Sequence, residues 1–192
     1  MSEEKPILKP AIAGCFTDWC SLHLPWAGAL GLQMAAPQVR WKHADEIFTW
    51  EVKCPLPETA RDSFAGGGFL EGLWNHDLAE CFLLDQSTGH YSEYNLGPGG
   101  AWWAAHFTGP RVRLIPQPQA GAWGIRASVA WSSDGWSGRM EMPLPPLVSP
   151  ALNFTAIVQT SDVRHFYSLA PLGGRLPDFH RPQEWLPQEF AH

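Results

Sequence analysis

Proline and glycine break this chain into many short segments, and this limits the elements that it can form. The 192 residues include 18 Pro and 18 Gly, spread along the whole sequence instead of gathered in one linker. Within the segments apolar and polar residues alternate, as in FTWEVKC at 48–54 and SGRMEM at 137–142. A period of two is typical of strands with one buried face. The pattern therefore predicts an all-β fold, an antiparallel β-sandwich.

We expect about ten strands in a single domain. No run longer than a turn or two has helical period, and a chain of this length has room for one sizeable core. The domain is expected to span 1–192, with its core at about 12–182 and an irregular tail at 177–192 that contains three prolines. The expected strands cover 16–24, 48–54, 79–85, 90–96, 101–107, 112–116, 125–131, 136–144, 152–159 and 163–170.

The charge balance and the N-terminal sequence limit the partners. The formal net charge is −6, and the 13 Lys and Arg form no basic run apart from Arg111-Val112-Arg113. Nucleic acid and membranes are therefore disfavoured as partners. The first residues show neither a secretory signal nor an apolar span. The four cysteines lack CxxC spacing, and Cys54 and Cys81 fall on core positions, so we expect buried free thiols and a cytoplasmic location.

The segment 72–107 predicts three consecutive strands that share one polar face. Pairing Asp85 with His90 places Glu80 opposite Asn95, whereas a one-residue slip would put Glu80 among apolar residues. Across the next turn we pair Leu96 with Ala101. The predicted ligand face then carries Glu80, Tyr91, Glu93, Asn95, Trp102 and His106, with Trp74 just upstream, while Trp103, Ala105 and Phe107 are expected in the core.

Eleven tryptophans are more than a core of this size needs, so some are expected to line a groove or to be exposed. An indole ring offers a flat apolar surface to the face of a sugar ring. Trp74 is the candidate platform and Trp102 a candidate second wall. Glu80, Glu93 and Asn95 have the donors and acceptors to bind sugar hydroxyl groups. A solvated outer face and structural hydrogen bonds are the alternative roles for these three residues.

Five blocks follow one another in a fixed order between about Phe48 and Pro182. They are Leu73-Trp74 through Asp77 to Glu80 and Phe82; Tyr91-Ser92-Glu93-Tyr94-Asn95 with Pro98, Gly100 and Trp102; Asp134-Gly135-Trp136 leading to Glu141-Met142-Pro143; Asn153-Phe154; and Tyr167-Ser168 with Pro177-Asp178-Phe179-His180-Arg181-Pro182. In this order the blocks resemble the DOMON-like superfamily, on the branch close to family 9 carbohydrate-binding modules. The resemblance implies a β-sandwich that binds sugars, or haem in other branches, and performs no catalysis.

The same resemblance implies roles for single residues. In family 9 modules a Trp and a Glu six positions later help to form the sugar site, and Trp74 and Glu80 match that spacing. Those modules also hold the sugar against a second Trp from a late segment, where this chain has Tyr167-Ser168-Leu169. Trp102 or Trp185 is the expected replacement. Asn153 is expected either to line the site or to cap a bulge.

Other functions remain open. Haem-binding relatives use an axial His with Met or a similar ligand, which Met34 with His106 or His165 would supply. A calcium site would need a cluster of oxygen ligands that the sequence does not show. A hydrolytic pair of Glu80 and Glu93 is disfavoured, because nothing marks one carboxyl as protonated and the other as ionised. A face that binds another protein is the third alternative.

The predicted function is therefore non-catalytic binding of a mono- or oligosaccharide, without a cofactor or a metal ion. The sequence does not set the oligomeric state. The predicted ligand-binding residues are Trp74, Glu80, Glu93, Asn95, Trp102 and Asn153.

Overall fold

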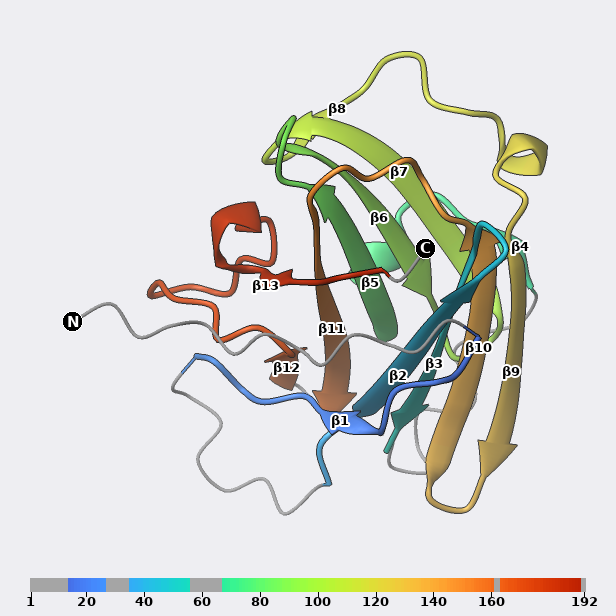
Figure 1. Cartoon of the computed structure of the whole chain (residues 1–192). Coiled ribbons are helices and arrows are strands. Elements are labelled where there is room, and N and C mark those ends of the chain that lie inside the picture. The colour runs from blue at the N-terminus through green and yellow to red at the C-terminus, as the bar shows by residue number, and fades with distance from the viewer. Residues whose placement is uncertain (1–13, 27–34, 56–66, 161–162, 191–192) are drawn as a thin grey trace.

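Two β-sheets form a sandwich in the computed structural model, which describes residues 14–26, 35–55, 67–160 and 163–190 (Figure 1). All pairs in the smaller sheet are antiparallel. Its five strands follow the order β1 (Cys20–Ser21), β2 (Gln38–Ala44), β3 (Ile47–Cys54), β10 (Gly135–Pro143) and β9 (Arg126–Ser132). The architecture confirms the predicted all-β sandwich.

The larger sheet has eight strands, and its only parallel pair among the described residues is β4 with β7. Its main path runs β12 (Val163–Ser168), β11 (Pro150–Thr160), β5 (Leu78–Asp85), β6 (His90–Leu96), β7 (Ala101–Gly109) and β4 (Gly68–Phe69). At its margins β13 (Leu186–Pro187) pairs with β11, and β8 (Val112–Arg113) pairs with β7. Short 3₁₀ helices connect the strands: η2 (Leu73–Asn75), η3 (Ala120–Ala122) and η4 (Pro182–Glu184). Within the described ranges, no helix has the length and apolar character needed to cross a membrane.

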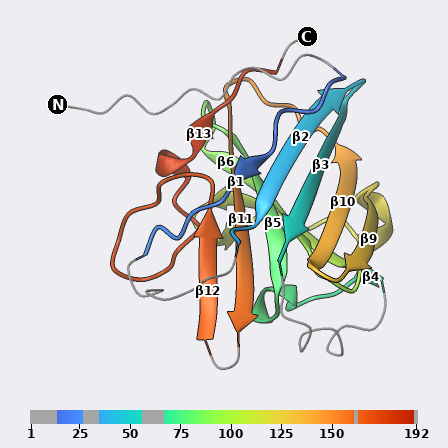
Figure 2. The same ribbon diagram turned by 90° about the horizontal axis from the view of Figure 1, so that it is seen from below.

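The core lies between the two sheets and is rich in aromatic side chains. Phe154 of β11 packs against Trp41 of β2 and Trp50 of β3, with ring centroids 5.1 and 5.9 Å apart, and all three side chains are buried. Figure 2 shows the sheets from below, with β2, β3, β10 and β9 in one and β12, β11 and β5 in the other. Cys54 and Cys81 are buried free thiols in this core, which confirms the prediction for both.

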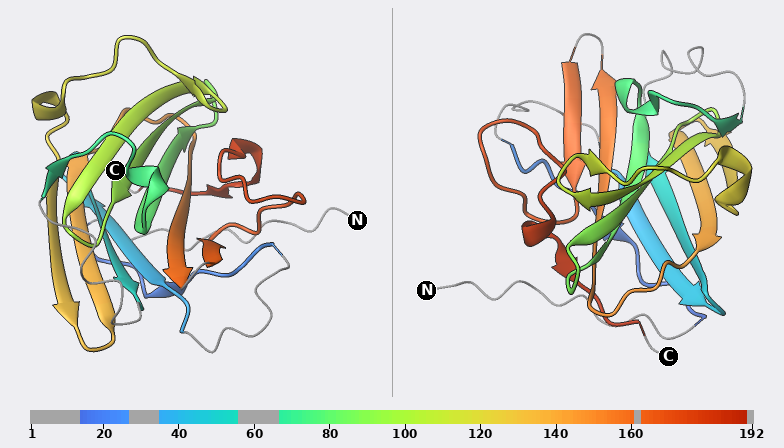
Figure 3. Two further views of the ribbon diagram at one scale, coloured as in Figure 1. Left: turned by 180° about the vertical axis from the view of Figure 1, so that it is seen from behind. Right: turned by 90° about the horizontal axis from the view of Figure 1, so that it is seen from above.

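The C-terminal segment covers part of the outer face of the larger sheet. Trp185, directly after η4, is buried against Phe82 of β5 and Tyr91 of β6, with ring centroids 5.0 and 5.1 Å apart. All eight residues of β5 are buried, the inward-facing ones by the core between the sheets. Figure 3 shows this segment, drawn in red, beside the larger sheet from two further directions. The tail that was expected to be irregular thus includes a 3₁₀ turn and a strand that pairs with β11.

Thirteen strands occur in the described residues, against about ten expected. The additional strands are β2, β4 and β13. In β2, buried Val39, Trp41 and His43 alternate with half-buried residues, so the period of two was present in the sequence. Strands β4 and β13 have two residues each, which is too short for any period to be visible. The strands expected at 16–24 and 112–116 shorten to β1 and β8.

The predicted register of β5 and β6 is confirmed, with Asp85 opposite His90. The predicted register of β6 and β7 is wrong by one residue, because Leu96 lies opposite Trp102 and not Ala101. The backbone N–H of Gly97 donates to the carbonyl of Ala101 (2.8 Å), which leaves a three-residue loop, 98–100. Gly100 closes this loop with a φ of 83°, a conformation that glycine adopts without steric cost.

A shift of one residue moves every side chain of a strand to the other face of its sheet. Trp103, Ala105 and Phe107 therefore share the outer face with Glu93 and Asn95. Trp102 and His106, which were predicted on that face, lie on the opposite one.

Candidate functional site

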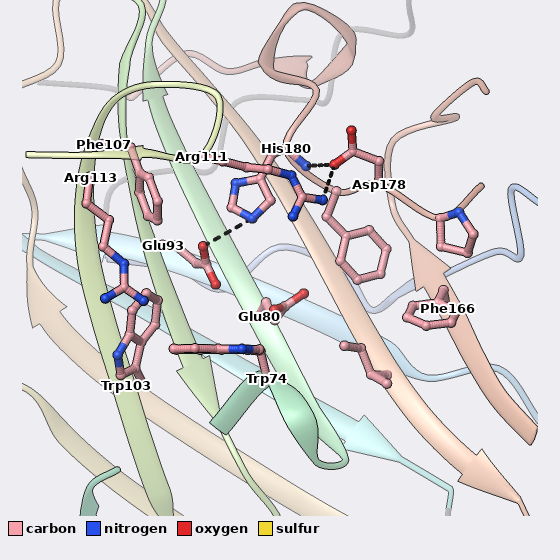
Figure 4. A pocket seen from close by; sticks show the side chains of 13 residues that line it. Trp74, Glu80, Glu93, Trp103, Phe107, Arg111, Arg113, Phe166, Asp178 and His180 are labelled. Carbon is pink, nitrogen blue, oxygen red and sulfur yellow. Dashed lines mark hydrogen bonds and ion pairs between the residues drawn. The ribbon is translucent and has the colours of Figure 1, made fainter. Parts of the chain in front are cut away.

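A cavity of about 310 Å³ opens on the outer face of the larger sheet, beside the C-terminal segment (Figure 4). Its walls come from η2, from the β7–β8 hairpin, from β11 and β12, and from residues 177–180. Its aromatic lining residues are Trp74, Trp103, Phe107, Phe166 and Phe179, and its charged or titratable ones are Glu80, Glu93, Arg111, Arg113, Asp178 and His180.

Two tryptophans form one wall of the cavity. Trp74 lies in the single turn of η2, which follows Gly72 with a φ of 83°. The indole of Trp74 meets that of Trp103 edge to face, with centroids 4.9 Å apart and planes at 73°. The backbone carbonyl of Trp74 accepts a hydrogen bond from Arg164 of β12 (2.8 Å), so the turn is attached to the far side of the sheet. The wall therefore has two independent supports.

Arg113 extends this wall. Its guanidinium carbon lies 5.3 Å from the ring centroid of Trp74 and 4.8 Å from that of Trp103, within the range of cation–π contacts. The same guanidinium donates to Glu71 (3.0 Å), which also accepts the indole N–H of Trp103 (2.8 Å). Glu71, Trp103 and Arg113 thus hold one another in place at the edge of the cavity.

Glu80 and Glu93 form the floor. They lie diagonally on the neighbouring strands β5 and β6 and expose only 3% and 4% of their surfaces. Glu80 accepts a hydrogen bond from the Thr155 hydroxyl, and Glu93 accepts one from the side-chain amide of Asn95 (3.0 Å). Burial raises the pKa of Glu80 above the ordinary carboxyl value. Burial, followed by the neighbouring Glu80, raises the pKa of Glu93 as well.

His180 links the C-terminal segment to this floor. Its Nδ1 lies 2.6 Å from the hydroxyl of Tyr91, and that hydroxyl accepts the backbone N–H of Arg111 (3.1 Å). The Tyr91 hydroxyl is therefore free to donate its proton to Nδ1, which leaves Nε2 as the protonated nitrogen, 3.7 Å from Glu93. Burial and the nearby Arg111 lower the pKa of His180 to about 4, so the imidazole is neutral at pH 7.

An ion pair joins two sides of the rim. Arg111, in the turn between β7 and β8, contacts Asp178 of the C-terminal segment at 2.8 Å, as a dashed line in Figure 4 shows. Both side chains are substantially exposed, so the pair contributes little to stability. The pair bridges the hairpin and the segment that together bound the cavity.

The structure brings together three of the predicted ligand residues. Trp74, Glu80 and Glu93 all line the cavity. Asn95 is fully buried beside them and donates to Glu93. Trp102 packs edge to face against Phe69 on the opposite side of the sheet (5.3 Å, 81°), because of the shifted register.

Asn153 and Trp185, the other two candidates, have structural roles. The Asn153 side chain bonds the Ser168 hydroxyl (3.1 Å) and accepts the backbone N–H of Ala170 (2.9 Å). These bonds join β11 to the end of β12, and Asn153 is not part of the cavity lining. Trp185 is 1% exposed between Phe82 and Tyr91, so it offers no surface to a ligand.

Several cavity residues were not predicted. Trp103 and Phe107 were predicted in the core. A three-residue loop between β6 and β7, in place of the four-residue loop assumed, would have predicted them on the outer face. Arg113 belongs to the short basic run that was noted only for its charge. Phe166 and Phe179 reach the cavity from β12 and from the closing motif, and no local pattern in the sequence indicates this.

The histidines considered for haem lie elsewhere. His106 bonds the Ser92 hydroxyl (2.8 Å) and packs on Trp123, with centroids 4.6 Å apart. His165 bonds the Thr160 hydroxyl (2.7 Å). Met34 lies outside the described residues. In the part of the chain that the structure describes, no group of three or more His, Cys, Asp or Glu side chains is arranged to hold a metal ion.

The sequence is similar to that of two mammalian proteins, and no protein-family model matches it. The UPF0462 protein C4orf33 homolog of Mus musculus is 28% identical over 167 residues, which cover 79% of this chain and 81% of the mouse protein. Its counterpart in Rattus norvegicus is 27% identical over 167 residues, which cover 80% of this chain and 79% of the rat protein.

The fold is shared with solved structures of two bacterial proteins. A proposed carbohydrate-binding protein from Bacteroides uniformis aligns with a TM-score of 0.66 and 15% identity, covering 91% of this chain and 86% of that one. A family 9 carbohydrate-binding module from Caldicellulosiruptor kristjanssonii, in complex with cellotriose, aligns with a TM-score of 0.56 and 12% identity. The alignment covers 96% of this chain and 90% of that one. A family 9 module of the same organism in complex with glucose aligns with a TM-score of 0.55 and 10% identity, covering 90% of this chain and 86% of that one. The resemblance to family 9 modules is thus confirmed for the fold, and the wider DOMON-like assignment stays a prediction.

Proposed function

We propose that this chain binds a mono- or oligosaccharide, without converting it, in the cavity above Glu80 and Glu93. One observation carries the proposal: the half-buried indole of Trp74, backed by the buried Trp103, stands next to two hydrogen-bonding carboxyl groups in one open cavity. A pyranose has apolar C–H faces and a polar rim of hydroxyl groups. Such a ring fits an aromatic wall on one side and carboxyl oxygens on the other.

The size and position of the cavity support a small ligand. A volume of about 310 Å³ is at the lower end of the range for small-molecule sites, about 300 to 1,000 Å³. It would hold one or two sugar units and leave the rest of a longer chain in solvent. The family 9 module that shares this fold was solved with glucose and with cellotriose, which adds support by analogy of fold.

The electrostatics of the floor favour binding over hydrolysis. A hydrolytic carboxyl pair needs one protonated acid and one ionised base or nucleophile at the same pH. Here burial raises the pKa of both Glu80 and Glu93, so their surroundings do not give them opposite roles. A protonated carboxyl donates and accepts hydrogen bonds, as sugar hydroxyl groups require. The cytoplasmic location stays a prediction, as does the absence of nucleic-acid and membrane partners.

Fluorescence titration with glucose, cellobiose and cellotriose tests the proposal. A sugar bound against Trp74 should change tryptophan emission in the unaltered protein, and Trp74→Ala should lose most of that response and weaken binding at least about tenfold. Trp102→Phe is the matched control, because Trp102 lies on the other side of the sheet. No response to any sugar, or an equal loss in Trp102→Phe, would count against the proposal.

A further inference from the structure

The floor of the cavity has more hydrogen-bond acceptors than donors. Glu80 uses one carboxyl oxygen to accept from Thr155, and its other oxygen has no hydrogen-bond donor within the described residues. Glu93 accepts from Asn95 through one oxygen, and its other oxygen is 3.7 Å from His180, beyond hydrogen-bonding distance. The buried side-chain oxygen of Asn95 also lacks a partner among the described residues. A buried acceptor without a partner, as at Asn95, is costly in a folded protein, whereas the second oxygens of Glu80 and Glu93 are left to a ligand or solvent in the cavity.

No cation of the described residues pairs with either carboxyl group. The two arginines that line the cavity are bound elsewhere, Arg111 to Asp178 and Arg113 to Glu71. Arg164 donates to the backbone carbonyl of Trp74. His180 Nε2 lies 3.7 Å from Glu93, and its imidazole is neutral at pH 7. Two buried carboxyl groups therefore share one cavity with no cation in direct contact, and only the more distant charges of Arg164, for Glu80, and of Arg113 and Arg111, for Glu93, attract them.

We propose that the preferred ligand is an amino sugar, whose protonated amine lies between Glu80 and Glu93 while its ring lies against Trp74. This proposal rests on the proposed function above. An ammonium group supplies the positive charge and three hydrogen-bond donors, which are the features that the floor lacks. The two carboxyl groups line the same cavity from neighbouring strands, so one bound ligand can contact both.

The aromatic wall suits a cationic ligand as well as a sugar ring. Arg113 already places its guanidinium over the rings of Trp74 and Trp103, so these indoles accommodate a positive charge in the present structure. In Figure 4 the Trp74 ring is seen edge-on, and Trp74 and Glu80 both line the cavity. An amine on the ring carbon nearest Glu80 would keep the sugar ring in contact with Trp74.

A calorimetric comparison of glucosamine, glucose and N-acetylglucosamine at about pH 6.5 tests this inference. The amine of glucosamine is largely protonated there, because a primary amine beside electron-withdrawing carbons resembles a peptide α-amino group, whose pKa is about 7.7 to 8.0. Glucosamine should bind at least about tenfold more tightly than either neutral sugar, the difference expected for charge-assisted hydrogen bonds. In Glu80→Gln and in Glu93→Gln the ratio of affinities should fall to within about threefold. Asp134→Asn, at the exposed β9–β10 turn, should keep the full ratio.

Proton release gives a second readout. A bound ammonium favours the ionised form of Glu80 and Glu93, so glucosamine binding should release protons while glucose binding should release fewer. The number released follows from the binding enthalpy in two buffers with different ionisation enthalpies. Equal affinities for glucosamine and glucose, or a preference that survives both Gln variants, would overturn the amino-sugar inference and leave the proposed function standing. Binding of none of the three sugars would overturn the amino-sugar inference, and it would overturn the proposed function too if cellobiose and cellotriose also fail to bind.

Discussion

Glu80 and Glu93 lie diagonally across β5 and β6, and both are nearly fully buried at the floor of one cavity. Two carboxyl groups in this arrangement disfavour each other's charge, and burial disfavours both charges. The consequence extends beyond ligand binding, because any group whose pKa differs between the folded and unfolded states makes stability depend on pH.

We expect the free energy of unfolding to fall as the pH rises from about 6.5 to about 8.5. Because the pKa values of Glu80 and Glu93 are raised in the folded protein, it still holds protons that the unfolded chain releases near pH 4.5. The contribution of these protons to stability is present at low pH and is lost as the pH rises through the pKa values of the folded protein. Folding lowers the pKa of His180 from 6.5 to about 4. His180 therefore makes stability rise with pH, but only below about pH 6.5. Urea unfolding at a series of pH values measures the slope.

The variant Glu93→Gln should flatten this decline, because it removes one titrating group and the repulsion that it exerts on Glu80. Asp134→Asn should leave the slope as it is in the unaltered protein. A stability profile that is flat above pH 6.5, or that declines equally in Glu93→Gln, would contradict the account of the floor.

Tyr91→Phe should destabilise the protein by about 1 to 3 kcal/mol, because it leaves Nδ1 of the partly buried His180 and the backbone N–H of Arg111 without their partner. Tyr167→Phe is the matched control: Tyr167 is equally buried, and its hydroxyl makes no hydrogen bond within the described residues. It should cost less than about 0.5 kcal/mol. Chemical denaturation of the two variants gives both values, and similar costs would show that the bond to His180 does not hold the C-terminal segment.

Gly138→Ala should destabilise the sandwich by about 1 to 3 kcal/mol through overpacking. A Cβ at Gly138 of β10 would lie 2.7 Å from Leu96 of the facing sheet and 2.8 Å from the Trp136 ring. Gly121→Ala is the control, since a Cβ there meets nothing within 4 Å. Thermal unfolding should show a lower melting temperature for the first variant alone. Equal melting temperatures would mean that the two sheets are not this close at β10.

The sequence predicted much of the site because alternation within one hairpin is a local property. The pairing of Asp85 with His90 followed from hydrophobic pattern and loop length, and it placed Glu80 and Glu93 on one face. The next strand was misplaced by one residue, since the Gly-rich turn permits two loop lengths that the sequence does not distinguish. Because of this one-residue error, Trp102 was predicted on the ligand face, whereas Trp103 lines the cavity in the structure.

The remaining part of the site depends on contacts between distant segments. His180 meets Tyr91 across 89 positions of the chain, and Phe166 and Phe179 reach the cavity from segments that follow β11. No periodicity in a single segment encodes such contacts. The sequence also did not predict the burial of both carboxyl groups. Alternation alone predicts a solvated outer face, whereas in the structure the C-terminal segment covers part of that face.

A crystal structure of the protein with the sugar that binds most tightly tests the central claim most directly. The account predicts the sugar ring against Trp74, with a hydroxyl or amine group within hydrogen-bonding distance of Glu80 or Glu93. A sugar bound elsewhere, such as the groove between Trp19 and Arg139 on the smaller sheet, would contradict it, as would an empty cavity at saturating sugar.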